Sequence, residues 1–237
     1  MKMYWKQFWL LYLAVAVMLV GICSGGSRAV TVMVETAPID RETVFVIDAG
    51  HGGEDGGAVS CTGVKESMIN LQIALRLDDL LHLLGFDTVM IRTTDDDVHT
   101  GGMTVAERKL SDLKERVRIV QETENAVLIS IHQNMFPEGK YSGAQMFYND
   151  VFGAEELARK LQEEFVKNLN PGSNRKCKPV DSIYLMEHID RPGILVECGF
   201  LSNPAEEAKL RTAAYQQQIC CVIASVLSGF ASEKANT

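Results

Sequence analysis

Short apolar segments that alternate with longer segments of helical periodicity constrain the fold of this chain most strongly. Continuous apolar runs are typical of strands in a parallel sheet that is covered on both faces. After the first run, apolar residues recur at helical spacing from Glu66 to Leu84, and Gly85 follows where helices commonly end. The pattern predicts an α/β domain with a mostly parallel twisted sheet flanked by helices. The three apolar runs are residues 44–47, 88–91 and 127–131.

Further elements continue this alternation toward the C-terminus. Thr104 and Glu107 have the spacing of a capping box, which predicts the start of another helix. Apolar spacing predicts a helix around Leu157, Leu161 and Phe165, and a closing helix over residues 215–230. Additional short strands are predicted at 143–148, close to a sheet edge, at 183–186 and at 194–196.

The N-terminus has the pattern of an export signal. Lys2 and Lys6 precede an uncharged apolar run from Phe8 to Cys23. Its position and flanking lysines favour a signal that is either cleaved or retained as an anchor, with the lysine end in the cytoplasm. A buried core helix is the disfavoured alternative. We therefore expect an exported, extracytoplasmic protein, anchored to the membrane if the segment is retained.

Charge and cysteine spacing exclude several classes of site. The net charge of -8 argues against a nucleic-acid partner, because such a partner requires a basic face. None of the six cysteines has CxxC spacing, so neither a thiolate metal site nor a disulfide framework is indicated.

Polar groups follow three of the predicted strands. The first strand leads to His51, the third to His132, and Val196 leads into Glu197. The carboxyl ends of parallel strands meet at one edge of a sheet, where ligands bind. Glu66 opens the helix after the first loop and can point back to that edge. Each also has an ordinary structural alternative. Taken singly, His51 is compatible with a loop histidine, His132 with a core histidine, Glu66 with a helix-start carboxylate and Glu197 with a buried ion-pair partner.

Two imidazoles, one carboxylate and a water make an open tetrahedral zinc site. Zinc lowers the pKa of its water toward neutrality, and a second carboxylate can accept and return the proton. These residues therefore favour a zinc hydrolase. Residue chemistry alone leaves open whether Glu66 or Glu197 binds the metal.

Four segments in order resemble the zinc-dependent N-acetylmuramoyl-L-alanine amidases of the amidase-3 family. The segments are 50–58, Glu66 with Asn70, 130–134 and 195–203, and the resemblance covers about residues 44–230. It implies a phosphorylase/hydrolase-like architecture. It also implies that 1–24 is the signal or anchor, 25–42 a linker, 43–232 the catalytic domain and 233–237 a tail.

The resemblance assigns roles to individual residues. It implies that His51, Glu66 and His132 bind one Zn²⁺ per chain and that Glu197 is the catalytic carboxylate. The reaction would be hydrolysis of the amide between N-acetylmuramic acid and the L-alanine of the stem peptide. Asn134 would contact substrate. Gln133 and Met135 stand where the family often has alanine, so the substrate groove is expected to differ in shape.

Residues 93–118 and 182–186 resemble the germination-specific branch of the family, which implies action on spore cortex and a step toward muramic-δ-lactam. Arg92 and Arg116 are candidates for gripping substrate carboxylates, with pairing to protein carboxylates as the alternative. Two rival functions are a zinc peptidase that cuts within the stem peptide and an inactive wall-binding module. Peptidoglycan is the expected partner, and the need for an activating protein stays open.

Overall fold

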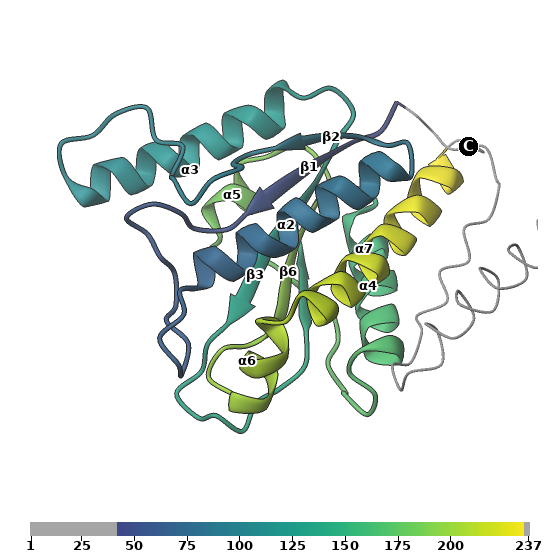
Figure 1. The fold of residues 1–237 in the computed structure, drawn as a ribbon. Coiled ribbons are helices and arrows are strands. Elements are labelled where there is room, and N and C mark those ends of the chain that lie inside the picture. Colours follow the sequence, from purple (N-terminus) through teal and green to yellow (C-terminus); the bar gives the residue numbers. More distant parts are fainter. Residues whose placement is uncertain (1–41, 235–237) are drawn as a thin grey trace, which may run out of the picture. The chain divides into compact units, whose positions relative to one another are not determined.

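The computed structural model describes residues 42–234, in which a six-stranded sheet lies between two groups of helices (Figure 1). The strand order is β2-β1-β3-β6-β4-β5, and of the paired strands only β4 and β6 run antiparallel. The predicted α/β fold with a mostly parallel sheet is confirmed. The strands are β1 (Val44–Ala49), β2 (Asp87–Met90), β3 (Ala126–Asn134), β4 (Gln145–Tyr148), β5 (Lys178–Pro179) and β6 (Gly193–Phe200).

The helices cover both faces of the sheet. One face carries α2, α4 and α7, and the other carries α3 and α5 (Figure 1). The predicted capping box begins α3, where Thr104 Oγ1 accepts from the backbone N–H of Glu107 at 3.2 Å. The helices are α2 (Glu66–Leu83), α3 (Val105–Glu122), α4 (Ala154–Asn168), α5 (Tyr184–Glu187), α6 (Pro204–Leu210) and α7 (Ala213–Lys234).

The sheet changes from apolar to polar along its α3/α5 face. Val46 of β1 is paired with Leu128 of β3, and both belong to an apolar cluster with residues of α3 and α5. Alternate residues share a face, so Ser130 and then His132 follow Leu128 on this face. His132 is paired in register with Glu197 of β6. The strands therefore bury an apolar half beneath α3 and α5 and present polar groups at their carboxyl ends.

Two elements differ from the sequence-based expectation. The predicted strand at 183–186 is wrong, because Tyr184–Glu187 form the helix α5. β6 is already paired with β3 and β4 on its two edges, and the apolar side chains of α5 pack on the α3/α5 face instead. The helix α6 was not predicted, although Asn203 accepts from two backbone N–H groups at its start and Pro204 follows.

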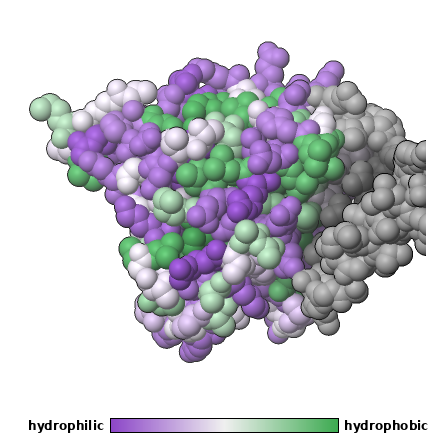
Figure 2. Space-filling model, viewed as in Figure 1, coloured by the Kyte–Doolittle hydropathy of each residue, from purple (hydrophilic) through white to green (hydrophobic). Residues whose placement is uncertain are grey.

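The predicted signal or anchor (1–24) and nearly all of the linker (25–42) lie outside the described residues. Within 42–234, no helix combines the length and the apolar character needed to cross a membrane. The five cysteines of this range are all free. The face seen in Figure 2 mixes hydrophilic residues with smaller hydrophobic groups, as expected of helices with one solvent-facing side.

Candidate active site

A glycine-rich turn after β1 brings His51 and His132 together. The φ angle of His51 is 62°, a left-handed conformation that is uncommon for residues other than glycine. The preceding Gly50 is essential to the packing, since a Cβ there would lie 2.2 Å from the His132 ring. The two imidazole centroids are 5.0 Å apart, nearly edge to face.

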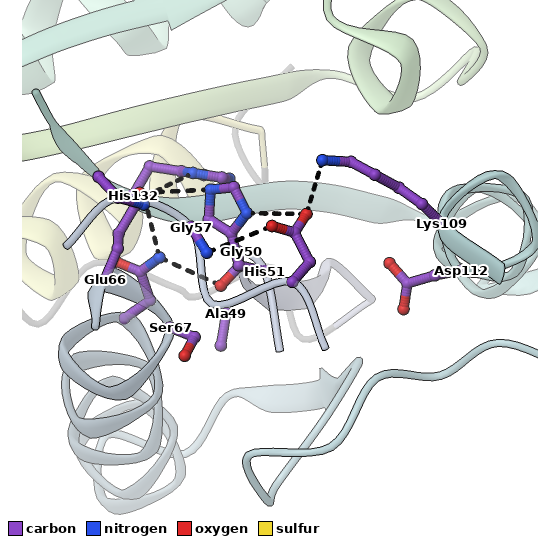
Figure 3. A network of polar contacts seen from close by, with 12 residues as sticks. Ala49, Gly50, His51, Gly57, Glu66, Ser67, Lys109, Asp112 and His132 are labelled. Atoms are coloured by element: carbon purple, nitrogen blue, oxygen red, sulfur yellow. Dashed lines mark hydrogen bonds and ion pairs between the residues drawn. The ribbon is translucent and has the colours of Figure 1, made fainter. Parts of the chain in front are cut away.

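Glu66, at the start of α2, lies between the two imidazoles (Figure 3). Its Oε2 is 3.3 Å from His51 Nε2, and its Oε1 is 3.1 Å from His132 Nδ1. The side chain also accepts from the backbone N–H groups of Ala58 and Gln133 at 3.0 Å each. Burial opposes ionisation, but the hydrogen bonds and charges of the two histidines hold the pKa of Glu66 well below its usual range. Glu66 is therefore an ionised carboxylate that is almost completely buried.

The donor set fits a zinc ion. One ligand atom each from His51, Glu66 and His132 can be chosen so that all lie within 4.8 Å of one another. Asp55 Oδ2 lies 3.1 Å from His51 Nδ1, which leaves Nε2 directed at Glu66. A carboxylate behind a histidine in this way is the usual arrangement around metal-binding imidazoles. Two imidazole nitrogens and one carboxylate oxygen are ligands that zinc accepts in open sites.

Glu197 faces the same site from β6. Its Oε2 is buried and has no hydrogen-bond partner among the described residues. Burial raises the pKa of Glu197 to about 7; the charge of His132 opposes this rise and the charge of Glu66 adds to it. Buried carboxylate oxygens are normally paired, and Glu197 also lines the pocket that contains His51 and His132, so its carboxylate is suited to exchange protons with a molecule bound there.

These groups open into a pocket of about 430 Å³. One wall comes from α3 and another from the segment around α5, including Tyr184 and Leu185. A larger cavity of about 1010 Å³ lies beside β4 and α6, but it contains none of the histidines or Glu197. The pocket that contains the histidines and Glu197 is therefore the smaller one, at the polar end of the sheet.

The family profile for N-acetylmuramoyl-L-alanine amidase matches residues 45–228. This chain belongs to the N-acetylmuramoyl-L-alanine amidase family. A germination-specific N-acetylmuramoyl-L-alanine amidase of Bacillus subtilis is 37% identical over 201 residues, which cover 84% of each chain. The resemblance inferred from the four sequence segments is thereby confirmed.

Solved amidase structures share the fold. The CwlD amidase from Clostridioides difficile, solved in complex with the GerS lipoprotein, is 34% identical with a TM-score of 0.76. That comparison covers 79% of this chain and 98% of the other. A second N-acetylmuramoyl-L-alanine amidase, from Clostridium difficile 630, is 29% identical with a TM-score of 0.70, covering 80% and 97% of the two chains.

In this amidase-family chain, the two candidate substrate-binding arginines are buried beneath the His51 turn. Arg92 donates to the carbonyl oxygens of Ala49 at 2.7 Å and Gly50 at 3.1 Å. Arg116 is paired with Asp48 and donates to the carbonyl oxygen of His51 at 2.8 Å. Both guanidinium groups therefore hold the turn, and their contact with substrate stays a prediction.

Asn134 ends β3, half-buried, and its carbonyl oxygen accepts from the N–H of Leu201 at 2.8 Å. Its contact with substrate is likewise still a prediction. Sequence reasoning missed Lys109 of α3, whose Nζ is 2.8 Å from Asp55 Oδ2. No motif marks this lysine, because only the packing of α3 beside the His51 turn brings it to the site (Figure 3).

Proposed function

We propose that this protein hydrolyses the amide bond between N-acetylmuramic acid and L-alanine in peptidoglycan, with one zinc ion held by His51, Glu66 and His132. The observation that carries the proposal is the unpaired, buried Oε2 of Glu197 beside that donor set. Glu66 is committed to both histidines and two backbone N–H groups. This division favours Glu66 as the ligand and Glu197 as the catalytic carboxylate.

The protein residues divide the work of hydrolysis. When bound, zinc polarises the scissile carbonyl and lowers the pKa of water. The Glu197 carboxylate, which lines the pocket, accepts the proton of the attacking water and delivers it to the nitrogen of the leaving L-alanine. Burial raises the pKa of Glu197 toward neutrality, which suits a group that must both gain and lose a proton. Asp55 orients His51 through Nδ1, and Gly50 leaves space for His132.

We further propose that the substrate is spore-cortex peptidoglycan and that cleavage is a step toward muramic-δ-lactam. The similarity to a germination-specific amidase over most of both chains supports this biological setting. Hydrolysis of the amide frees the lactyl carboxylate, and lactam formation then needs a muramic acid amine. A separate deacetylase must therefore supply that amine. Such a role places the catalytic domain outside the cytoplasm.

A digest of cortex peptidoglycan, with and without a chelator, tests the reaction and its metal. We expect mass spectrometry to detect intact stem peptides released from muramic acid, and chelation to stop their release. Added Zn²⁺ should restore it. Stems shortened from within would instead indicate a peptidase, and wall binding without turnover would indicate a binding module.

Glu197→Gln tests the catalytic carboxylate separately from the metal. The amide cannot accept the proton, so turnover should fall by about a hundredfold or more. Zinc content, measured by elemental analysis, should stay near one ion per chain. Turnover at the wild-type rate would remove Glu197 from the mechanism, whereas loss of zinc would make it a ligand.

We also propose that a protein partner supports activity, because a structural relative was solved with a lipoprotein bound. The test compares amide hydrolysis by the purified chain with and without a lipoprotein homologous to that partner. Higher turnover or tighter zinc binding in its presence supports the proposal. Full activity of the isolated chain, unchanged by the lipoprotein, contradicts it.

A further inference from the structure

Lys109 is an accessible cation on the wall of the active-site pocket. It lies on α3, and its side chain is 55% exposed. The other Lys or Arg among the described lining residues is Arg116, which is buried and bonded to Asp48, Asp112 and backbone carbonyl oxygens. Of these two lining residues, Lys109 is therefore the one whose positive charge can reach a bound molecule.

Asp55 holds Lys109 close to the reacting centre. The Asp55 carboxylate contacts Lys109 Nζ at 2.8 Å and His51 Nδ1 at 3.1 Å. Figure 3 shows Lys109 extending from α3 toward the His51 turn. An ammonium group has three N–H donors, and Asp55 is the carboxylate with which Lys109 forms an ion pair. The lysine can thus keep this contact and donate to a second anion in the pocket.

The stem peptide of the proposed substrate supplies such an anion. Its second residue is a glutamate linked through the side chain, so its α-carboxylate is free. An extended residue spans about 3.5 Å, which places this carboxylate within roughly 7 Å of the cleaved amide. Lys109 lies close to the same centre, joined to His51 through Asp55 by contacts of 2.8 Å and 3.1 Å. Because the chain carries a net charge of -8, an acidic peptide needs a local cation to bind favourably.

We propose that Lys109 binds the first free carboxylate of the stem peptide and makes the enzyme selective for stems in which it is not amidated. This inference rests on the proposed amidase function. It directs the peptide from the candidate metal site toward α3, along the wall formed by Lys109. Specificity would then arise from a side chain outside the four family segments, within the stretch 93–118 that resembles the germination-specific branch.

Paired substrates test the inference. Two muramyl peptides are compared, one with the free α-carboxylate and one with the α-carboxamide. We expect wild-type kcat/KM to be about tenfold higher for the carboxylate, mainly through KM, as for one hydrogen bond to a charged group. Lys109→Met should remove this preference, and Lys109→Arg should keep most of it. Lys114→Met, an exposed lysine of the same helix, is the matched control and should leave the preference unchanged.

Other outcomes separate the possible failures. An equal loss on both peptides with Lys109→Met would mean that Lys109 acts through Asp55 and His51, and would overturn the inference. No loss on either would also overturn it. Failure of the wild type to cleave either peptide would count against the proposed function. Calorimetric binding to Glu197→Gln then still tests Lys109, since the carboxylate peptide should bind more tightly only while Lys109 is present.

Discussion

Arg116 carries a buried positive charge between two carboxylates and the His51 turn. It is 2% exposed and paired with Asp48 and Asp112. Arg116→Met would leave Asp48 buried without its cation, a change that typically costs about 3–5 kcal/mol. Urea denaturation should show this loss in the free energy of unfolding.

The same helix provides a control for the Arg116 experiment. Arg118 pairs with Glu115 and Glu122, but its side chain is half exposed. Exposed pairs contribute little because solvent screens them, so Arg118→Met should be nearly neutral. Similar small effects at both positions would contradict a structural role for the buried pair.

The raised pKa of Glu197 predicts a pH profile. Glu197 must be ionised to accept a proton, so its rate contribution is present above its pKa and lost as pH falls through it. Burial raises this pKa to about 7, and the positive charge of a bound zinc ion lowers it again. The acid limb of kcat/KM should therefore have its midpoint at or below about pH 7. A midpoint well above 7 would assign that limb to another group.

Among the glycines of residues 42–234, Gly50 in the turn after β1 has the least room for a Cβ. A Cβ at Gly50 would lie 2.2 Å from the His132 ring, so Gly50→Ala must displace that imidazole. We expect Gly50→Ala to retain its circular dichroism spectrum while zinc content and amide hydrolysis both fall steeply. Elemental analysis and the muropeptide digest measure the two losses.

Gly101 offers the matched control, because a Cβ there would meet no atom within 4 Å. Gly101→Ala should keep both zinc and activity. If Gly50→Ala also bound a full complement of zinc, the close packing of the turn against His132 would not matter for the metal.

The strands and long helices could be predicted because burial leaves a strong periodic signal in their residues. The segment 183–186 could not, since a short apolar run fits a strand and a packed helix equally well. What decided it was the pairing of β6 on both edges, which is a property of the whole sheet. The short helix α6 carried its signal in Asn203 and Pro204 rather than in periodicity.

In the site, too, some features could be predicted from local sequence and others depend on long-range packing. The convergence of His51, Glu66 and His132 followed from their places at strand and helix ends, and the structure brings them together. The contact of Lys109 with Asp55 depends on how α3 packs beside a turn distant in sequence. Long-range packing of this kind leaves no local pattern to read.

Across the molecule, metal binding and folding should be coupled. A ligand that binds only the folded chain stabilises it by about 2.7 kcal/mol at a hundred times its Kd. Chelation should therefore lower the Tm of the wild type by several degrees. His132→Ala should show the same Tm with and without chelator, whatever its own stability. A wild-type Tm that chelation leaves unchanged would contradict a metal shared by these elements.

The candidate ligands come from the turn after β1, the start of α2 and the end of β3. The chain between Glu66 and His132 is long and includes β2 and α3. Closing such a loop in the unfolded chain costs entropy, so an ion at this point would serve as a cross-link. The five cysteines of residues 42–234 are free and form no covalent cross-link. The metal would provide a reversible cross-link between these three segments instead.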